Sequence, residues 1–329
     1  MSDRNLFSYT IQRLGQGTIV ILLVSFLSFL LLYFSPGDCL ADQKLNQSLS
    51  PEFIKAEEAR RGLDRPFIEQ YGRWMFNLAQ GNLGRTCQGN APVLRLIIER
   101  SGNTLIFALS AIFSTWLIAI PMGIWAAINR NKIIDRSVQL ISYILQGFPG
   151  FVMVILLLIF AQNSGIFPVG GLRSLDYDEY NLLGKIADIA YHLILPVGAS
   201  FLIGFAGLQR LMRGNLLDVL EEDYIRTARA KGLPESKVIY VHALRNAVNP
   251  LVTLLGFQLA SLLSGSFITE LLFGLPGLGQ LLFEAVRQKD INLAMAGFML
   301  GSIMLVLGNL IADILLKLVD PRIKLNDPS

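Results

Sequence analysis

The chain has 329 residues, of which 53% are hydrophobic and 16% are charged, and its formal net charge is +3. Soluble globular domains carry about 25% charged residues, so the composition argues against an ordinary soluble protein. The small net charge gives no reason to expect a nucleic-acid partner. Long uncharged runs alternate with charged connectors, which predicts an all-α polytopic membrane protein surrounded by a lipid bilayer.

Six apolar runs are long enough to cross a membrane, because about 20 helical residues span about 30 Å of hydrocarbon. The predicted transmembrane helices are 17–34, 104–128, 138–161, 189–208, 248–269 and 291–311. A cleaved signal sequence is the alternative for the first run. Its 18 uncharged residues exceed the usual hydrophobic region of about 7–15 residues, and no A-x-A-like site follows, so a transmembrane helix is favoured.

The distribution of Lys and Arg predicts the orientation of the chain. If the N-terminus is cytoplasmic, the four inside segments hold 15 of these residues and each of the two short outside loops holds 2. The inside segments are 1–16, 129–137, 209–247 and 312–329. The long loop 35–103 holds 9, but loops of that length cross the membrane largely regardless of charge. We therefore predict six spans with both termini inside.

The first long connector predicts a small helical cap on the extracytoplasmic side. Segment 35–103 is too long for a plain loop, and prolines and glycines stand where helices begin and end. The predicted helices of the cap are 51–61, 66–79 and 92–100. The chain thus divides into a tail with the first span (1–34), the cap (35–103) and a five-helix membrane core (104–329).

Both cysteines, Cys39 and Cys87, fall in the cap. An oxidising compartment permits a disulfide between them, and two unpaired thiols are the alternative.

The predicted spans contain almost no ionisable side chain, unlike those of proton- or ion-coupled transporters. The most polar deep side chains are Gln146, Gln258 and Asn309. They are candidates for a pore, and interhelical hydrogen bonds are the alternative role. Phosphate-binding, zinc-hydrolase and serine-hydrolase motifs are absent from the sequence, so we expect no catalytic residues, metal site or cofactor in this chain. An intramembrane enzyme, an autonomous channel and a secondary carrier are therefore disfavoured.

The inside segment 209–247 is a polar insert with two predicted helices. The first has an apolar face formed by Leu217, Leu220, Tyr224 and Ala228. On it, Glu222 and Arg226 form a predicted i,i+4 ion pair. Gly232 suits the left-handed position that ends a helix, and Pro234 suits the first turn of the next one. The second helix has an apolar face formed by Val238, Val241, Leu244 and Val248. A docking element and a self-contained solvated hairpin are the two interpretations.

The segment "GLPGLGQ" at 274–280 follows the fifth span on the outer side. Pro276 and its neighbouring glycines, Gly277 among them, are expected to interrupt a helix near the pore mouth. A gate or pore lining and a plain re-entrant turn are the alternatives.

The polar insert resembles the cytoplasmic EAA loop of ABC importer permeases. Aligned on Gly232, it keeps Ala228 and Leu244 of the general pattern, and "DYIRTARAKGLP" with "HALRNA" resembles the form of B-type dipeptide/oligopeptide permeases. Further motifs similar to that subfamily are "SPGD", "GLDRPFIEQYGRW", "GNLGRT", "ERSGNTLIFALSA", "IPMGIWAA", "FPGFV" and "LLFGLPGLGQLLFEAVRQKD". The resemblance covers nearly the whole chain.

The resemblance implies a type I importer permease in a prokaryotic inner membrane, carrying di- or oligopeptides. Nickel complexes, glutathione and oligosaccharides are alternative cargoes. The implied partners are a second, C-type permease, two ATPase subunits that bind ATP and Mg²⁺, and an extracytoplasmic substrate-binding protein. The implied ATPase-coupling residues are Tyr224, Arg226, Thr227, Ala228, Ala230, Lys231, Gly232, Leu233, Pro234, His242 and Leu244.

Overall fold

The computed structural model describes residues 3–41, 44, 50–260, 262 and 267–319. Within these ranges the regular structure is helical, and the extended pairing is limited to one isolated bridge between Arg85 and Pro92. The predicted all-α class is therefore confirmed. Parts of the predicted cap (42–43 and 45–49) and of the predicted inside tail (320–329) lie outside the described residues.

Four of the described helices are long and apolar enough to cross a membrane, and the number rises to as many as six if each of two bent helix pairs counts as one span. The four helices are α1 (Asp3–Phe34), α5 (Val93–Ile128), α8 (Leu182–Leu220) and α15 (Ile291–Val319). The two pairs are α6 (Ile133–Gly147) with α7 (Gly150–Ser164), and Glu235–Ala247 with Asn249–Leu259. Each of the six predicted runs falls largely on one of these elements.

The third predicted span is sharply bent. Its two halves, α6 and α7, meet at an angle of 95° across Phe148 and Pro149. Phe148 is extended (φ −93°, ψ 131°), because the ring of the following proline disfavours the helical region for the residue before it. A continuous helix over 138–161 was therefore the wrong expectation, and the Phe-Pro-Gly sequence is the physical reason.

Two other helix boundaries also differ from expectation. The predicted cap helix 92–100 is not separate, since α5 runs without a break from Val93 to Ile128. In the fifth predicted span, α12 (Asn249–Ala260) is followed by a short helix, α13 (Phe267–Leu272). Residues 261 and 263–266 of that span lie outside the described residues.

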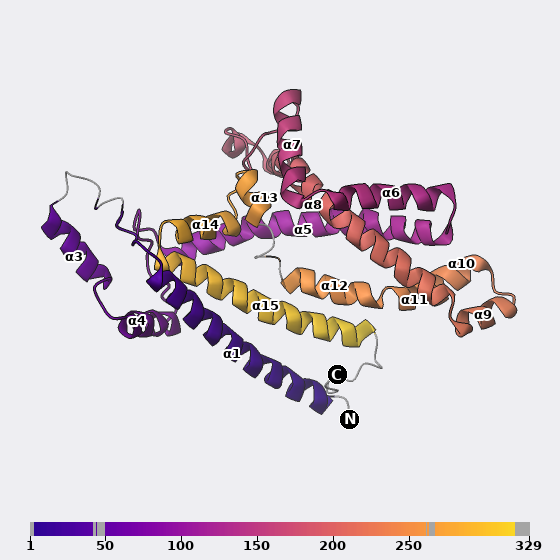
Figure 1. Ribbon diagram of the computed structural model, residues 1–329, viewed down its shortest axis with the longest axis horizontal. Coiled ribbons are helices and arrows are strands. Elements are labelled where there is room, and N and C mark those ends of the chain that lie inside the picture. Colours follow the sequence, from indigo (N-terminus) through magenta and orange to yellow (C-terminus); the bar gives the residue numbers. More distant parts are fainter. Residues whose placement is uncertain (1–2, 42–43, 45–49, 261, 263–266, 320–329) are drawn as a thin grey trace. The chain divides into compact units, whose positions relative to one another are not determined.

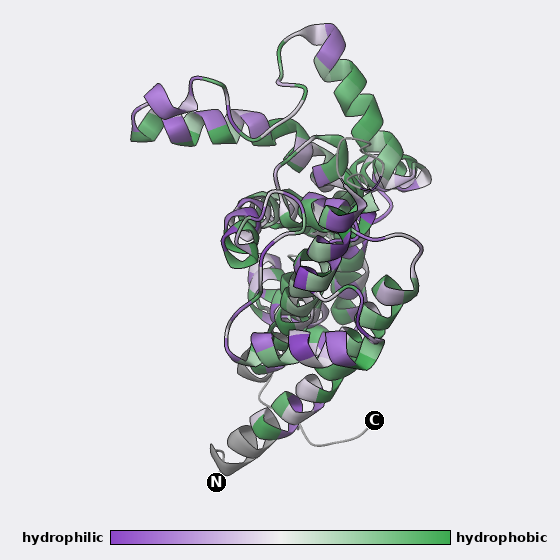
Figure 2. Cartoon of the chain, turned by 90° about the vertical axis from the view of Figure 1, so that its left-hand side faces the viewer, coloured by the Kyte–Doolittle hydropathy of each residue, from purple (hydrophilic) through white to green (hydrophobic). Residues whose placement is uncertain are grey.

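The long helices expose apolar side chains along much of their length, and they are coloured mainly as hydrophobic in Figure 2. Leu31 on α1 is 73% exposed and Phe113 on α5 is 68% exposed. In water this would be unfavourable, but a lipid environment is as apolar as these side chains. The exposed surface is thus that of a membrane protein.

The first of two compact units comprises 1–104 and 276–306, and it contains the cap. The cap helices α3 (Pro51–Arg61) and α4 (Phe67–Ala79) begin and end where the sequence predicts, apart from one residue at the start of α4. Helix α4 packs on α1 through aromatic side chains, since the rings of Phe67 and Tyr71 lie 5.4–5.6 Å from that of Phe29. Such edge-on ring pairs stabilise the contact beyond simple burial.

The second unit comprises 105–275 and 307–329 and is organised around α8 (Figure 1). Helix α6 packs along α8, where the Ser142 hydroxyl donates a hydrogen bond of 2.9 Å to the buried Gln209 side chain. In Figure 1, α9 (Asp223–Ala230) and α10 (Glu235–Lys237) lie at one end of α8, and α7 lies near the other. The polar insert therefore extends from the end of this central helix.

Candidate functional site

The turn between α9 and α10 has the geometry that the sequence predicts. Gly232 is left-handed, with φ +76°. Its N–H donates to the Arg229 carbonyl at 2.9 Å, and the Leu233 N–H donates to the Ala228 carbonyl at 3.4 Å. These two bonds form a Schellman motif, which satisfies carbonyls left unpaired at a helix end. A Cβ at Gly232 would meet open space, so the backbone conformation alone demands glycine.

Helix α9 is attached to the bundle by one narrow face. Ile225 is 0% exposed and Ala228 is 8% exposed, and both pack in a buried cluster with Met212 and Leu216 of α8. The rest of the helix points outward. The exposed predicted coupling residues are Tyr224, Arg226, Thr227, Ala230, Lys231, Gly232 and Pro234. A fixed base with a projecting polar face is the arrangement that a docking element requires.

The predicted apolar face of the first insert helix is wrong in part. Leu217 and Leu220 belong to α8, which ends at Leu220, so they are not on one helix with Tyr224. The predicted pair of Glu222 with Arg226 is also replaced. Glu222 is the extended N-cap residue of α9 (ψ 147°), and Arg226 pairs with Asp223 instead, at 3.3 Å.

The second insert helix differs because its first part is a π-helix. Residues Val238–Ala243 (η2) take this wider form and lead into α11 (Leu244–Ala247). The wider turn shifts the buried face, so that Val241 is 53% exposed while Ala243 is buried. The expected face containing Val241 is therefore wrong. Leu233, His242 and Leu244 are half-buried beside this segment. π-Helical turns are rare and occur frequently at functional sites.

Polar contacts hold the two sides of the turn together. The Arg229 guanidinium donates to both carboxylate oxygens of Glu235, at 2.7 and 3.2 Å, across the Gly232 turn. The Asn246 side chain donates to the Tyr224 hydroxyl at 2.7 Å. The two-point geometry of an Arg–carboxylate pair fixes orientation as well as distance. These contacts join α9, α10 and α11 into one hairpin.

A charged connector braces the base of this hairpin. The Asp135 carboxylate accepts two hydrogen bonds from Arg213 of α8, at 2.6 and 2.8 Å, and a third from the Asn131 N–H at 2.9 Å. A second, exposed ion pair joins Arg130 to Glu221 at 2.7 Å. The sequence carried no signal for either pair, because their members are 78 and 91 residues apart.

The polar pore candidates lie in different environments. Gln146 is exposed on α6, and Asn309 is half-buried on α15. Gln258 accepts a hydrogen bond of 2.8 Å from the Trp116 indole, and it lines a cavity of about 190 Å³ with Thr115 and Thr269. Interhelical bonding therefore applies to Gln258, and a pore role for the three stays a prediction.

The predicted outer turn at Pro276 and Gly277 is held against α5 at Asn103 and Thr104. The Asn103 side chain donates to the Pro276 carbonyl at 2.8 Å, and the Leu278 N–H donates to the Thr104 hydroxyl at 2.8 Å. Gly277 is buried and precedes α14 (Leu278–Arg287). These contacts fix the turn, and its role in gating stays a prediction.

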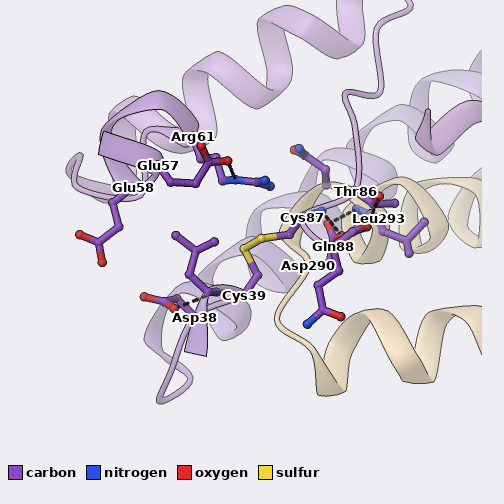
Figure 3. Close-up of a disulfide and its surroundings, with 12 residues drawn as sticks. Asp38, Cys39, Glu57, Glu58, Arg61, Thr86, Cys87, Gln88, Asp290 and Leu293 are labelled. Atoms are coloured by element: carbon purple, nitrogen blue, oxygen red, sulfur yellow. Dashed lines mark hydrogen bonds and ion pairs between the residues drawn. A yellow bond between two sulfur atoms is a disulfide. The ribbon is translucent and has the colours of Figure 1, made fainter. Parts of the chain in front are cut away.

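In the first unit, a disulfide joins Cys39 to Cys87, whose Cα atoms are 6.0 Å apart (Figure 3). Asp290, directly before α15, accepts hydrogen bonds from the Cys87 N–H at 2.5 Å and the Leu293 N–H at 3.1 Å. Burial raises the pKa of the Asp290 carboxyl, and the amide donors oppose that change. Asp290 thus caps the last long helix and holds the disulfide loop against it. In the sequence, Asp290 is only the last residue of a family-like motif, and no role was predicted for it.

The described residues contain no group of three or more His, Cys, Asp or Glu side chains that could hold a metal ion.

Two family models match the chain. "Binding-protein-dependent transport system inner membrane component" matches residues 119–325, and the N-terminal model of the same membrane component matches residues 6–115. The Oligopeptide transport system permease protein AppB of Bacillus subtilis is 37% identical over 322 residues, covering 96% of this chain and 99% of that protein.

Other relatives are similar over the same extent. The Dipeptide transport system permease protein DppB of Escherichia coli K12 is 32% identical, with 97% of this chain and 99% of that protein covered. The Di/tripeptide transport system permease protein DppB of Pseudomonas aeruginosa is 34% identical at the same coverage. Among solved structures, an inward-facing MetNI methionine ABC transporter has a TM-score of 0.54 and 18% identity, and covers 69% of this chain and 98% of that chain. At this identity, the structural match supports the fold alone.

Proposed function

Because this chain belongs to the family of binding-protein-dependent transport system inner membrane components, we propose that it is a permease subunit of an ATP-driven importer for di- and oligopeptides. Family membership makes it a multi-pass component of an inner-membrane transport system rather than an enzyme. The relatives are named as oligopeptide, dipeptide and di/tripeptide transport permeases, and these names support the cargo class.

The observation that carries the proposal is the hairpin around Gly232. Its base is buried in the bundle through Ile225, and its outer face presents Tyr224, Arg226 and Lys231 to a partner. A rigid projection on a membrane bundle transmits force when a partner grips it, because packed elements move as units. We propose that this hairpin binds in a cleft of an ATPase subunit. The ATPase subunits would bind ATP and Mg²⁺, and their closure would move the hairpin.

The family name includes dependence on a binding protein, which supports an extracytoplasmic partner for this chain. With both termini inside, the cap formed by α3, α4 and the disulfide loop would face that partner. A second, C-type permease would complete the pathway, and two ATPase subunits would bind the two coupling hairpins. Nickel complexes, glutathione and oligosaccharides are the alternative cargoes within the same machine.

The coupling role is tested with Gly232→Pro in the reconstituted importer. Proline has its φ fixed near −65° and lacks an N–H, so it can neither adopt φ +76° nor donate to Arg229. We expect ATP hydrolysis stimulated by the cargo-loaded binding protein to fall at least tenfold. Stimulated hydrolysis is measured in nanodiscs, beside the yield of co-purified ATPase subunits.

Gly165→Pro is the matched control. Gly165 is also left-handed (φ +62°), donates its N–H to the carbonyl of Ala161 at 3.0 Å and has open space around it, but it follows α7. Gly165→Pro should disturb the backbone to a similar degree but leave the stimulated ATP hydrolysis nearly unchanged. Stimulation that survives Gly232→Pro would refute the coupling role, and uptake of peptide by this chain alone, without ATP, would refute the importer function.

A further inference from the structure

The cap contains a polar cavity of about 410 Å³ with an excess of positive charge in its wall. The cavity lies between α3, α4, the disulfide loop and the residues that join α14 to α15, all of which belong to the first unit. Its basic lining residues are Arg60, Arg61, Arg73, Arg85 and Lys289. Asp290 is the one carboxylate residue among the described lining residues.

The carboxylates near the cavity neutralise only part of this charge. Glu57 pairs with both Arg60 and Arg61, at 3.7 and 2.7 Å, and Glu69 pairs with Arg73 at 3.4 Å. Neither glutamate lines the cavity. Figure 3 shows Glu57 beside Arg61, with Asp290 next to the disulfide loop. The two oxygens of Asp290 accept backbone N–H groups, so it caps a helix and closes the loop, and its charge also interacts with Arg61.

Arg85 and Lys289 donate to neutral acceptors in the described contacts. Arg85 bonds the carbonyl of Asn90 at 2.9 Å, and Lys289 bonds the hydroxyl of Ser35. Neither acceptor carries charge, so both cations keep their attraction for an anion. Guanidinium and ammonium groups with neutral neighbours in a concave site bind carboxylates well, because each charged hydrogen bond is stronger than a neutral one.

Lys289 also has an unusual backbone. It is left-handed (φ +56°) and occupies the position after α14 that glycine normally takes, with its N–H bonded to the Val286 carbonyl at 3.2 Å. The following Asp290 N–H bonds the Ala285 carbonyl at 2.8 Å, which completes a Schellman motif. A lysine held in a conformation that favours glycine, with its side chain at a cavity, supports use of that side chain in binding.

We propose that this basic pocket receives acidic side chains from the surface of the substrate-binding protein when that protein docks on the cap. This inference rests on the proposed function, which supplies such a partner on the extracytoplasmic side. Charge complementarity carries it, since a cluster of cations in a concave wall attracts a negatively charged surface and speeds its correct docking. The pocket would therefore set the docking rate and orientation, independently of which peptide is carried.

Lys289→Gly and Arg85→Glu test the pocket in the complete importer, held in nanodiscs of neutral phosphatidylcholine. Glycine suits the left-handed position, so Lys289→Gly removes a cation without disturbing the fold. We expect the association rate of the loaded binding protein, at about 50 mM salt, to fall about threefold to tenfold for Lys289→Gly and further for Arg85→Glu. At about 500 mM salt both variants should match the wild type, because salt screens charge attraction.

Lys55→Glu is the matched control, since Lys55 is an exposed cation on α3 that does not line the pocket. It should change the rate less than twofold. Unchanged rates for both pocket variants, or an equal loss for Lys55→Glu, would overturn the proposal. The proposal would also be overturned if the pocket variants instead changed the binding of anionic lipid added to the nanodiscs or of millimolar free peptide. If the binding protein fails to stimulate ATP hydrolysis by the wild-type complex, the proposed function itself is refuted. If it stimulates hydrolysis but the pocket variants associate at the wild-type rate, only this inference is refuted.

Discussion

Asp135 and Arg213 form a largely buried ion pair, with side chains 4% and 23% exposed. Their two-point contact joins the start of α6 to the last part of α8, the helix from whose end the Gly232 hairpin extends. A buried charge that loses its partner is strongly unfavourable, because neither water nor another group compensates it. The pair of Arg130 and Glu221 has side chains 54% and 65% exposed, so it is expected to contribute far less to stability.

Asp135→Ala should therefore lower the free energy of unfolding by about 3–5 kcal/mol, because Arg213 stays buried without its carboxylate. Glu221→Ala serves as the comparison and should cost less than about 1 kcal/mol, since its side chain is 65% exposed. Thermal unfolding of the purified chain in detergent measures both. Equal losses for the two variants would contradict the importance of burial at Asp135.

Sequence reasoning succeeded where one residue determines its own neighbourhood. Gly232 was predicted to be left-handed because no other residue takes that conformation as easily, and its φ is +76°. Sequence reasoning could not find the pair of Asp135 and Arg213, since this contact depends on how two helices far apart in the sequence pack together. Asp290 was missed for the same reason, as its role requires a loop 203 residues earlier in the chain.

At the level of the helix, the two faces of α9 have separate tasks. Ile225 and Ala228 anchor the helix in the buried cluster, while Tyr224 and Arg226 face outward. An anchoring residue contributes to stability through burial, whereas an outward residue contributes mainly when a partner is present, apart from its local contact with Asn246 or Asp223. Substitutions on the two faces should therefore have effects that can be told apart.

Ile225→Ala should lower the free energy of unfolding by about 2–5 kcal/mol, because it leaves a cavity at a fully buried position. Tyr224→Ala should change stability by less than about 1 kcal/mol, since the residue is 42% exposed. If the proposed coupling role is correct, it should also reduce stimulated ATP hydrolysis severalfold. Thermal unfolding and ATPase assays on the same preparations distinguish the two results. If the Tyr224→Ala complex showed wild-type stimulation of ATP hydrolysis, Tyr224 would not be part of a functional contact with the ATPase.

Local signals also decide how well each helix could be predicted. Helix α3 was predicted to the residue because Pro51 occupies its first turn and Gly62 ends it, and in the structure Ser50 also caps its start through a bond from the Phe53 N–H. The bend between α6 and α7 has an equally local cause in Pro149, but the apolar run on either side outweighed that signal. The π-helix had no such signal, because packing against the neighbouring helices determines which turns widen.

At the scale of the whole molecule, the cap and the Gly232 hairpin belong to different compact units. The disulfide closes a loop with a sequence separation of 48 residues, and it acts on the cap. A bridge of that length stabilises a chain by up to about 4 kcal/mol through the lost freedom of the unfolded loop. Effects at sites that share no partners are additive, so the two units should respond independently.

Replacement of both Cys39 and Cys87 by serine should destabilise the cap by up to about 4 kcal/mol and weaken docking of the binding protein. Assembly with the ATPase subunits and hydrolysis without binding protein should remain at wild-type levels. Limited proteolysis of the cap, the association rate of the binding protein, co-purification with the ATPase subunits and basal ATPase assays measure these four effects. A loss of ATPase assembly in the double variant would contradict the independence of the two units.

The contact of Asp290 with the Cys87 N–H has a consequence for the order of assembly during synthesis. The ribosome delivers residue 87 long before residue 290, and 203 residues at about 5–20 residues per second take about 10–40 s. During that interval the cap has its cysteines but lacks the carboxylate that secures their loop. The cap can therefore be completed only after the start of α15 has been synthesised. By then nearly the entire chain has left the ribosome.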